Sequence, residues 1–119
     1  MIGAVLLAAA LLVPSAASAH ASLVKSVPGR RAVLAAAPAR VHLWFNERLE
    51  PAFSRLSVWD AAGKQVDARD VQVDGQDPKL LTVGIPTLPP GRYTVRFRVL
   101  SVDGHVVESE FPFTLRGSQ

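Results

Sequence analysis

The stretch "RYTVRFRVLSVDGHVVESEFPFTL", Arg92 to Leu115, decides the fold. Apolar residues occupy every second position from Tyr93 to Val99, and a similar alternation returns between Val107 and Leu115. A period of two is typical of a β-strand that turns one face to a core and the other to water. The Asp-Gly pair between the two halves is typical of a hairpin turn. Pro112 interrupts the second strand, which predicts an edge position or a bulge there.

The same alternation recurs upstream in "VHLWFN", "RLSVWD" and "LLTVGI". Clusters of Gly, Pro and Asp, such as "DAAGK", "VDGQDP" and "TLPPGR", separate these segments and predict turns. For residues 31–37, "RAVLAAA", we expect a loop with a short turn. Several short strands at this spacing predict an all-β protein, an immunoglobulin-like Greek-key β-sandwich of about seven strands.

The first nineteen residues are typical of a secretory signal peptide. An apolar run from Ile2 to Val13 precedes the small residues Ala17-Ser18-Ala19, although no Lys or Arg precedes the run. The run is too short to span a bilayer, which needs about 20 apolar residues. We therefore expect residues 1–19 to be removed on export, leaving one domain at residues 20–119 that does not span the membrane. An uncleaved N-terminal anchor is the alternative.

The amino-acid composition argues against some classes of function and limits the ligands that the domain can offer. The 119 residues include 13 basic and 10 acidic side chains, and the basic ones are scattered, which argues against a nucleic-acid-binding surface. The chain has no cysteine, and its only methionine is Met1. A domain that begins at residue 20 therefore contains no sulfur atom and must be held together by its core.

Cleavage after Ala19 would make His20 the first residue. A terminal histidine can bind one metal ion through both its α-amine and its ring Nδ1, closing an unstrained six-membered ring. An internal histidine cannot do this, because its backbone nitrogen is an amide. The amine titrates near pH ~8 and imidazole near ~6.5, so a metal displaces their protons easily.

The segment Asp103-Gly104-His105 offers two more ligands. Residues i and i+2 of an extended segment point to the same side, so the carboxylate and the imidazole can converge. Together with His20 they supply an amine nitrogen, two ring nitrogens and a carboxylate oxygen. Such a set suits Cu(II) in tetragonal geometry, whereas Cu(I) prefers Cys or Met ligands, which this domain lacks. The alternative is a plain hairpin turn without a metal.

The remaining candidate residues have simpler interpretations. His42 lies on the face of its predicted strand opposite Val41 and Leu43, so we expect it to face solvent. We expect Trp44 and Trp59 to be packing or edge residues. Tyr93 is expected to fill the core.

The chain from His20 onward resembles the CopC family of bacterial periplasmic copper-binding proteins. The resemblance rests on "HASLVKSVP", on "LWFNERLEPAFSRLSVWDAAGK" and above all on "LPPGRYTVRFRVLSVDGHVVESEFPFTL". It implies a small Greek-key β-sandwich that binds Cu(II) through His20, Asp103 and His105. It also implies that Glu47, in "FNERL", is a further ligand or orients His20. The Met-rich Cu(I) site of some members has no counterpart here.

The resemblance implies a periplasmic protein that holds Cu(II) for copper resistance, homeostasis or delivery, with an inner-membrane transporter of the CopD type as partner. The sequence offers no nucleophile paired with a base, so no residue pattern in it indicates an enzyme. Three alternatives remain open. They are a copper-dependent oxygenase with an N-terminal histidine centre, a metal-free immunoglobulin-like interaction module, and a zinc site, since two His and one Asp also suit zinc.

Overall fold

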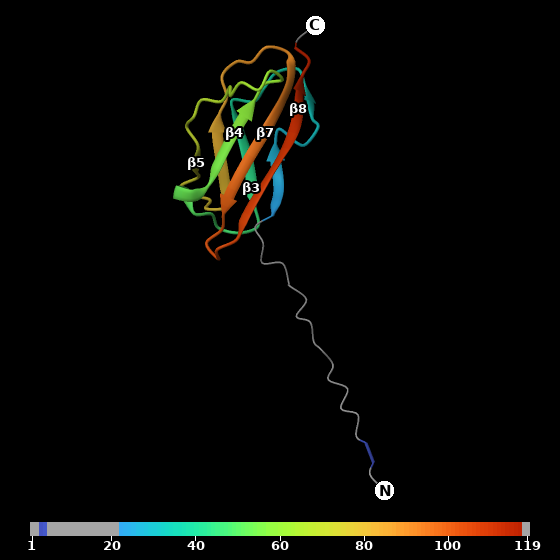
Figure 1. Ribbon diagram of the computed structural model, residues 1–119. Helices are drawn as coiled ribbons and strands as arrows, with labels where there is room; N and C mark the ends of the chain where they lie inside the picture. The colour runs from blue at the N-terminus through green and yellow to red at the C-terminus, as the bar shows by residue number, and fades with distance from the viewer. Residues whose placement is uncertain (1–2, 5–21, 118–119) are drawn as a thin grey trace.

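A computed structural model of the chain describes residues 3–4 and 22–117, and residues 22–117 form a β-sandwich (Figure 1). One 3-10 turn, η1 (Pro51–Phe53), precedes β4. The strands of the described residues are β1 (Leu23–Val27), β2 (Val33–Leu34), β3 (Arg40–Phe45), β4 (Arg55–Trp59), β5 (Gln72–Val73), β6 (Leu80–Gly84), β7 (Gly91–Leu100) and β8 (Val106–Leu115).

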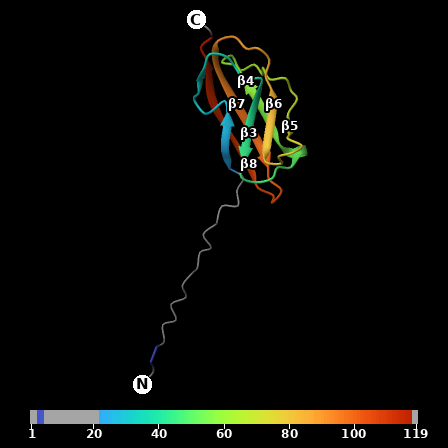
Figure 2. The same ribbon diagram turned by 180° about the vertical axis from the view of Figure 1, so that it is seen from behind.

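The strands form two four-stranded sheets, with the order β1-β3-β6-β5 in one and β2-β8-β7-β4 in the other. Figures 1 and 2 show the two sheets from opposite sides. From β1 to β5 the chain crosses from one sheet to the other at every connection, as in immunoglobulin-like sandwiches. It stays within one sheet only at the β5–β6 and β7–β8 connections. The predicted β-sandwich is confirmed.

The core lies between the sheets and is built by the alternating residues of the sequence. In β3 the inward residues are buried and the outward ones half-buried. β7 repeats the pattern, with exposed arginines on its outer face. Tyr93 is buried as expected, and its hydroxyl donates a hydrogen bond of 2.5 Å to the Pro89 carbonyl. Each buried Val, Leu or Phe contributes about 1.5–3 kcal/mol relative to exposure. The largest fully buried side chains include Phe45, Phe113, Leu43, Leu81, Val41, Val58, Val83, Val95 and Val99.

Three strands differ from the prediction. The segment 31–37 contains the two-residue strand β2, which pairs in parallel with the end of β8, where we expected only a loop. β5 is equally short, and β1 lacks a clean alternation because its register against β3 shifts between Leu23 and Lys25. Eight strands, instead of about seven, are therefore present in the described residues.

Pro112 sits in β8 without a bulge, because the register of β7 against β8 is continuous through Thr94 and Pro112. The Pro112 carbonyl accepts a hydrogen bond of 2.7 Å from the backbone N–H of Arg31, on the side away from β7. In an antiparallel strand the nitrogen and the carbonyl of one residue point the same way. The proline therefore removes no hydrogen bond of the β7–β8 ladder. β2 pairs with β8 only at Thr114 and Leu115, so Pro112 has a strand partner on one side alone, and the predicted edge position is confirmed without a bulge.

One end of the sandwich gathers segments that are distant in sequence. The start of β1, the end of β3 and the turn between β7 and β8 lie together there in both views (Figures 1 and 2). Two antiparallel registers explain this arrangement, since Leu23 pairs with Phe45 and Leu49 forms a bridge with Ser101. Among the described residues, no helix is long and apolar enough to cross a membrane.

Candidate metal site

The β7–β8 turn, residues 101–105, is held by its own backbone. The Ser101 N–H donates to the His105 carbonyl at 2.9 Å, and the Gly104 N–H donates to the Ser101 carbonyl at 2.9 Å. Gly104 has a φ of 90°, in the region that glycine adopts without steric cost. The segment is therefore the hairpin turn that the Asp-Gly pair indicated, and it does not have the extended conformation from which we argued that Asp103 and His105 converge.

The turn nevertheless brings Asp103 and His105 together, as predicted. The His105 Nδ1 lies 3.2 Å from the Asp103 Oδ1. The side chain of His105 is 42% exposed and that of Asp103 31%, but the His105 Nδ1 itself is buried, so the exposed part of the ring does not include this nitrogen. A carboxylate oxygen and an imidazole at this separation can act on one ion together, or the carboxylate can orient the ring for a bond through Nε2.

Ser101 holds Asp103 in place through a hydrogen bond. Its side chain is buried, and its hydroxyl donates a hydrogen bond to the Asp103 Oδ1. This bond lowers the pKa of Asp103 below its ordinary range, with a smaller contribution from His105. The carboxylate therefore stays ionised through neutral and mildly acidic pH. The sequence reasoning missed Ser101, although the motif S-x-D-G-H places it two residues before the aspartate.

The chain before β1 is fixed at the same end of the molecule. The Ser22 N–H donates to the Asn46 Oδ1 at 2.6 Å, and the Asn46 N–H donates to the Ser22 carbonyl at 3.1 Å. Two residues beyond Asn46, the Arg48 carbonyl accepts a hydrogen bond of 2.9 Å from the Val102 N–H. Residues 46–48 thus connect the start of the described domain to the turn that carries Asp103. The sequence reasoning did not identify the role of Asn46.

Two predicted ligands are not part of this contact. Glu47 is half-buried in the segment between Asn46 and Arg48, at the same end as the Asp103–His105 pair. His20 lies outside the described residues, as does the predicted signal peptide except for residues 3–4. Within residues 3–4 and 22–117, no three His, Asp or Glu side chains lie close enough together to hold a metal ion.

The third histidine is separate from this end. His42 is half-buried on the outer face of β3, where its ring stacks on Trp44 with centroids 5.5 Å apart. The Lys25 Nζ covers the Trp44 ring at 4.8 Å. Trp59 packs on the outer face of the other sheet, so the expected packing role of both tryptophans is confirmed.

Comparison with known sequences gives one consistent family. The family model of the CopC domain matches residues 23–116. Protein YobA of Escherichia coli strain K12 is 33% identical over 93% of this chain and 90% of its own length. Copper resistance protein C of Pseudomonas syringae pv. tomato is 32% identical over 93% of this chain and 92% of its own length. Copper transport protein CutJ of Bacillus subtilis is 33% identical over 93% of this chain, but the chain spans only 21% of that relative.

Solved structures give the same result. The crystal structure of CopC from Methylosinus trichosporium OB3b has a TM-score of 0.78 and 39% identity, covering 84% of this chain and 97% of that one. PcoC from Escherichia coli, described as a methionine-rich copper resistance protein, has a TM-score of 0.71 and 32% identity, covering 82% of this chain and 100% of that one. Both similarities extend over the described sandwich.

Proposed function

Because the chain belongs to the CopC family, whose named members include copper resistance proteins, we propose that it is an exported, non-enzymatic protein that binds Cu(II). The observation that carries this proposal is the contact between Asp103 and His105 on a turn beside the anchored Ser22. His20 precedes Ser22 by two residues, which can span about 7 Å. A short N-terminal arm can therefore bring further ligands toward the pair.

The proposed ligands are the amine and Nδ1 of His20, the carboxylate of Asp103 and the imidazole of His105. Bound copper would be the cargo of the protein. Signal-peptide removal after Ala19 creates the amine ligand, so the site would form only after export to the periplasm. Glu47 lies next to Asn46, which binds Ser22, and we assign it to a contact with the metal or with His20.

The oxidation state follows from the available donor atoms. The family relative PcoC is described as methionine rich, whereas this chain has one methionine, at position 1, and no cysteine. Nitrogen and oxygen donors suit Cu(II), whereas Cu(I) prefers softer sulfur ligands. The proposed cargo is therefore Cu(II), without a second site for Cu(I).

The proposed role is to hold Cu(II) in the periplasm for resistance, homeostasis or delivery. The relative CutJ is named a copper transport protein, and this chain matches about a fifth of it. That similarity supports a membrane transporter of the CopD type as the recipient. A protein whose role is to hold and pass on an ion needs no nucleophile.

The test is a Cu(II) titration of two versions of the protein, one beginning at His20 and one with an additional Met before it. We expect the first to bind one Cu(II) tightly with a nitrogen-rich tetragonal EPR signal, and the second to bind far more weakly. Equal binding would exclude the amine as a ligand. Zn(II) competition separates a copper site from a tetrahedral zinc site.

Two histidine variants provide the matched comparison. His105→Ala should lose most of the affinity, whereas His42→Ala should behave like the unmodified protein because His42 stacks on Trp44 on the outer face of β3. Equal losses in both variants would contradict the proposed site.

A further inference from the structure

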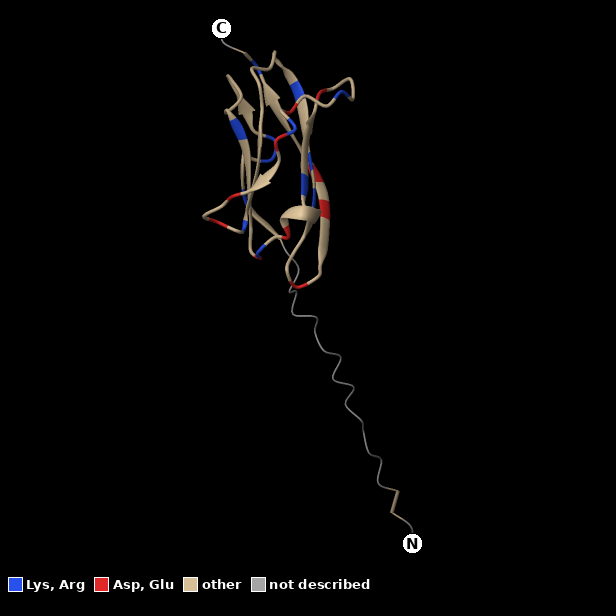
Figure 3. Ribbon diagram, turned by 90° about the vertical axis from the view of Figure 1, so that its left-hand side faces the viewer, with Lys and Arg blue, Asp and Glu red and all other residues tan. Residues whose placement is uncertain are grey.

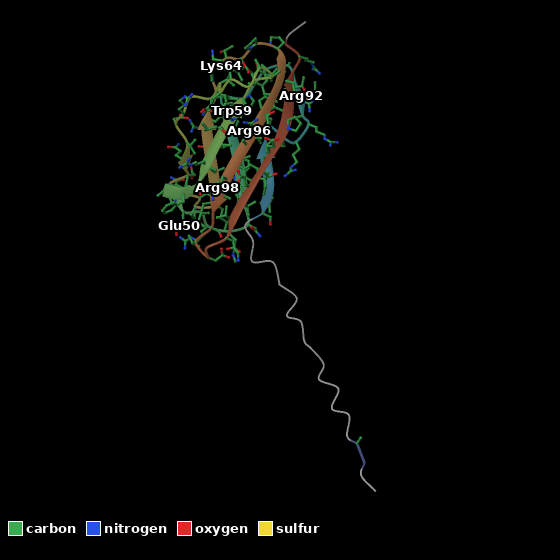
Figure 4. All side chains as sticks on the ribbon, in the orientation of Figure 1. Glu50, Trp59, Lys64, Arg92, Arg96 and Arg98 are labelled. Carbon is green, nitrogen blue, oxygen red and sulfur yellow. The ribbon has the colours of Figure 1, made fainter. Side chains whose placement is uncertain are left out.

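An open groove crosses the outer face of β4, β7 and β8, and neither Asp103 nor His105 lines it. Its volume is about 460 Å³. Figure 4 shows this face, with Arg92, Arg96 and Arg98 along β7 and Trp59 beside Arg96. The groove is lined by Arg55, Ser57 and Trp59 from β4, by Arg96 and Arg98 from β7 and by Glu108 and Glu110 from β8, among others.

One side of the groove is fixed by contacts. The Trp59 Nε1 donates to the Ser57 Oγ at 2.8 Å, and the guanidinium of Arg96 lies over the Trp59 ring at 4.9 Å. The Arg96 Nε also donates to the Glu110 Oε2 at 2.9 Å. Arg96 is therefore compensated by a carboxylate and held in place by an aromatic ring.

The other side carries uncompensated positive charge. Arg55 and Arg98 are direct cross-strand partners of β4 and β7, and both are exposed on the outer face. Like charges directly opposite each other destabilise a sheet. Arg98 has only a long contact of 3.8 Å with Glu108, and within residues 22–117 no carboxylate lies within ion-pair distance of Arg55. Glu108, the cross-strand partner of Arg98 on β8, therefore compensates Arg98 in part, and the positive charge that the described residues leave without a carboxylate is that of Arg55.

We propose that this groove binds an acidic segment of a partner protein, with one partner carboxylate held between Arg55 and Arg98. Guanidinium groups match carboxylates in planar, bidentate geometry, and two of them can bind one carboxylate from both sides. A bound carboxylate would also remove the repulsion between the two arginines.

The charge pattern favours a protein segment over a membrane surface. β7 and β8 carry both basic and acidic positions along the same hairpin, seen as blue and red bands in Figure 3. Glu108 and Glu110 are exposed and would be repelled by a uniformly anionic lipid surface. A peptide can place its negative charge between the arginines and keep it away from the two glutamates.

The groove lies next to the proposed copper turn. The pair Arg98–Glu108 is followed along the ladder by Val99–Val107 and Leu100–Val106, and the turn begins at Ser101. At about 3.4 Å per residue, the turn starts about 10 Å from Arg98. A partner seated in the groove would therefore lie beside the turn, although the groove uses none of the proposed copper ligands.

The experiment is an NMR titration of the ¹⁵N-labelled protein with a blocked eight-residue peptide of alternating Glu and Thr. A Gln-Thr peptide is the neutral control. We expect the Glu peptide to shift the amides of Arg55 and Arg98 and the indole N–H of Trp59. The indole of Trp44, on the other sheet, should stay in place. The shifts should weaken with added salt.

Substitutions separate binding from stability. Arg55→Gln and Arg98→Gln should each weaken peptide binding about tenfold, the loss of one charge-assisted contact. Arg55→Gln should keep or raise the melting temperature, because it removes the repulsive pair and breaks no ion pair, whereas Arg98→Gln also removes the contact with Glu108. Arg116→Gln, an exposed arginine after β8, should bind the peptide normally. Cu(II) affinity should be unchanged in Arg55→Gln, so failure of this proposal is distinct from failure of the copper site.

Three results would overturn the proposal. The first is the absence of shifts with the Glu peptide at millimolar concentration, and the second is equal shifts with the Gln peptide. The third is binding to phosphatidylglycerol vesicles through Arg55 and Arg98 without any response to the peptide, which would assign the face to the membrane.

Discussion

Replacing Asn46 by Ala tests whether the segment before β1 belongs to the metal site. The change removes the side-chain bond from the Ser22 N–H but keeps the backbone bond from the Asn46 N–H to the Ser22 carbonyl. A neutral hydrogen bond contributes about 0.5–1.5 kcal/mol net, and about 1.4 kcal/mol corresponds to tenfold in affinity. If the arm carries ligands, Cu(II) affinity should fall about two- to tenfold in Asn46→Ala.

The assay is a competition titration against a Cu(II) chelator, made on a double-mutant cycle. One axis is Asn46→Ala, and the other is an additional Met before His20, which removes the amine ligand. We expect the Asn46 effect in the protein that begins at His20 and its loss in the extended protein, because coupled changes are not additive. An effect of the same size in both backgrounds, or in neither, would refute the reasoning. Urea unfolding of the metal-free proteins checks that the fold is intact.

Three further predictions follow from the site and the sheets. Ser101→Ala should weaken Cu(II) binding about 10- to 100-fold, since it removes the hydrogen bond that supports Asp103; an unchanged titration would exclude that role. Gly104→Ala should destabilise the metal-free fold by about 1–2 kcal/mol in urea unfolding, because alanine is strained at a φ of 90°, and equal midpoints would contradict this. The pKa of Asp70 is lowered by the Gly84 N–H and by Arg40, so its charge stabilises the fold above pH ~4 and this contribution is lost as the pH falls through the lowered pKa. Asp70→Asn should therefore be less stable than the unmodified protein at pH 7 and equally stable near pH 2, measured by urea unfolding at both values.

Most strands that could be predicted from sequence have one buried and one more exposed face, whereas β6 alternates in sequence although both of its faces are buried. β7 and β8 show one-sided burial most clearly. When one face of a strand is buried and the other is not, apolar and polar residues alternate in the sequence. β2 and β5 have two residues each, too few for any period, and they exist because neighbouring strands offer hydrogen-bond partners. Such pairings depend on the tertiary fold and leave no local signal.

The contacts of the candidate site also divide into those that the sequence predicts and those that depend on the tertiary fold. Asp103 and His105 are close in sequence, so their contact could be predicted, and the Asp-Gly pair indicated the hairpin turn that carries them. The bond between Ser22 and Asn46 joins residues 24 positions apart and depends on the pairing of β1 with β3. The opposition of Arg55 and Arg98 likewise depends on the register of β4 against β7, which a single sequence does not reveal.

The ten-residue ladder of β7 and β8 has a consequence for how a metal can leave the protein. The turn at its end is outside the buried core, and no core residue is a proposed ligand. Small zinc domains lose their fold with their metal, because the ion replaces a core. A Cu(II) ion at the proposed site would dissociate by local opening at one end while both sheets stay paired. The rate of ion release is then independent of the rate of global unfolding. A carrier can therefore have a stable fold and still release its ion quickly.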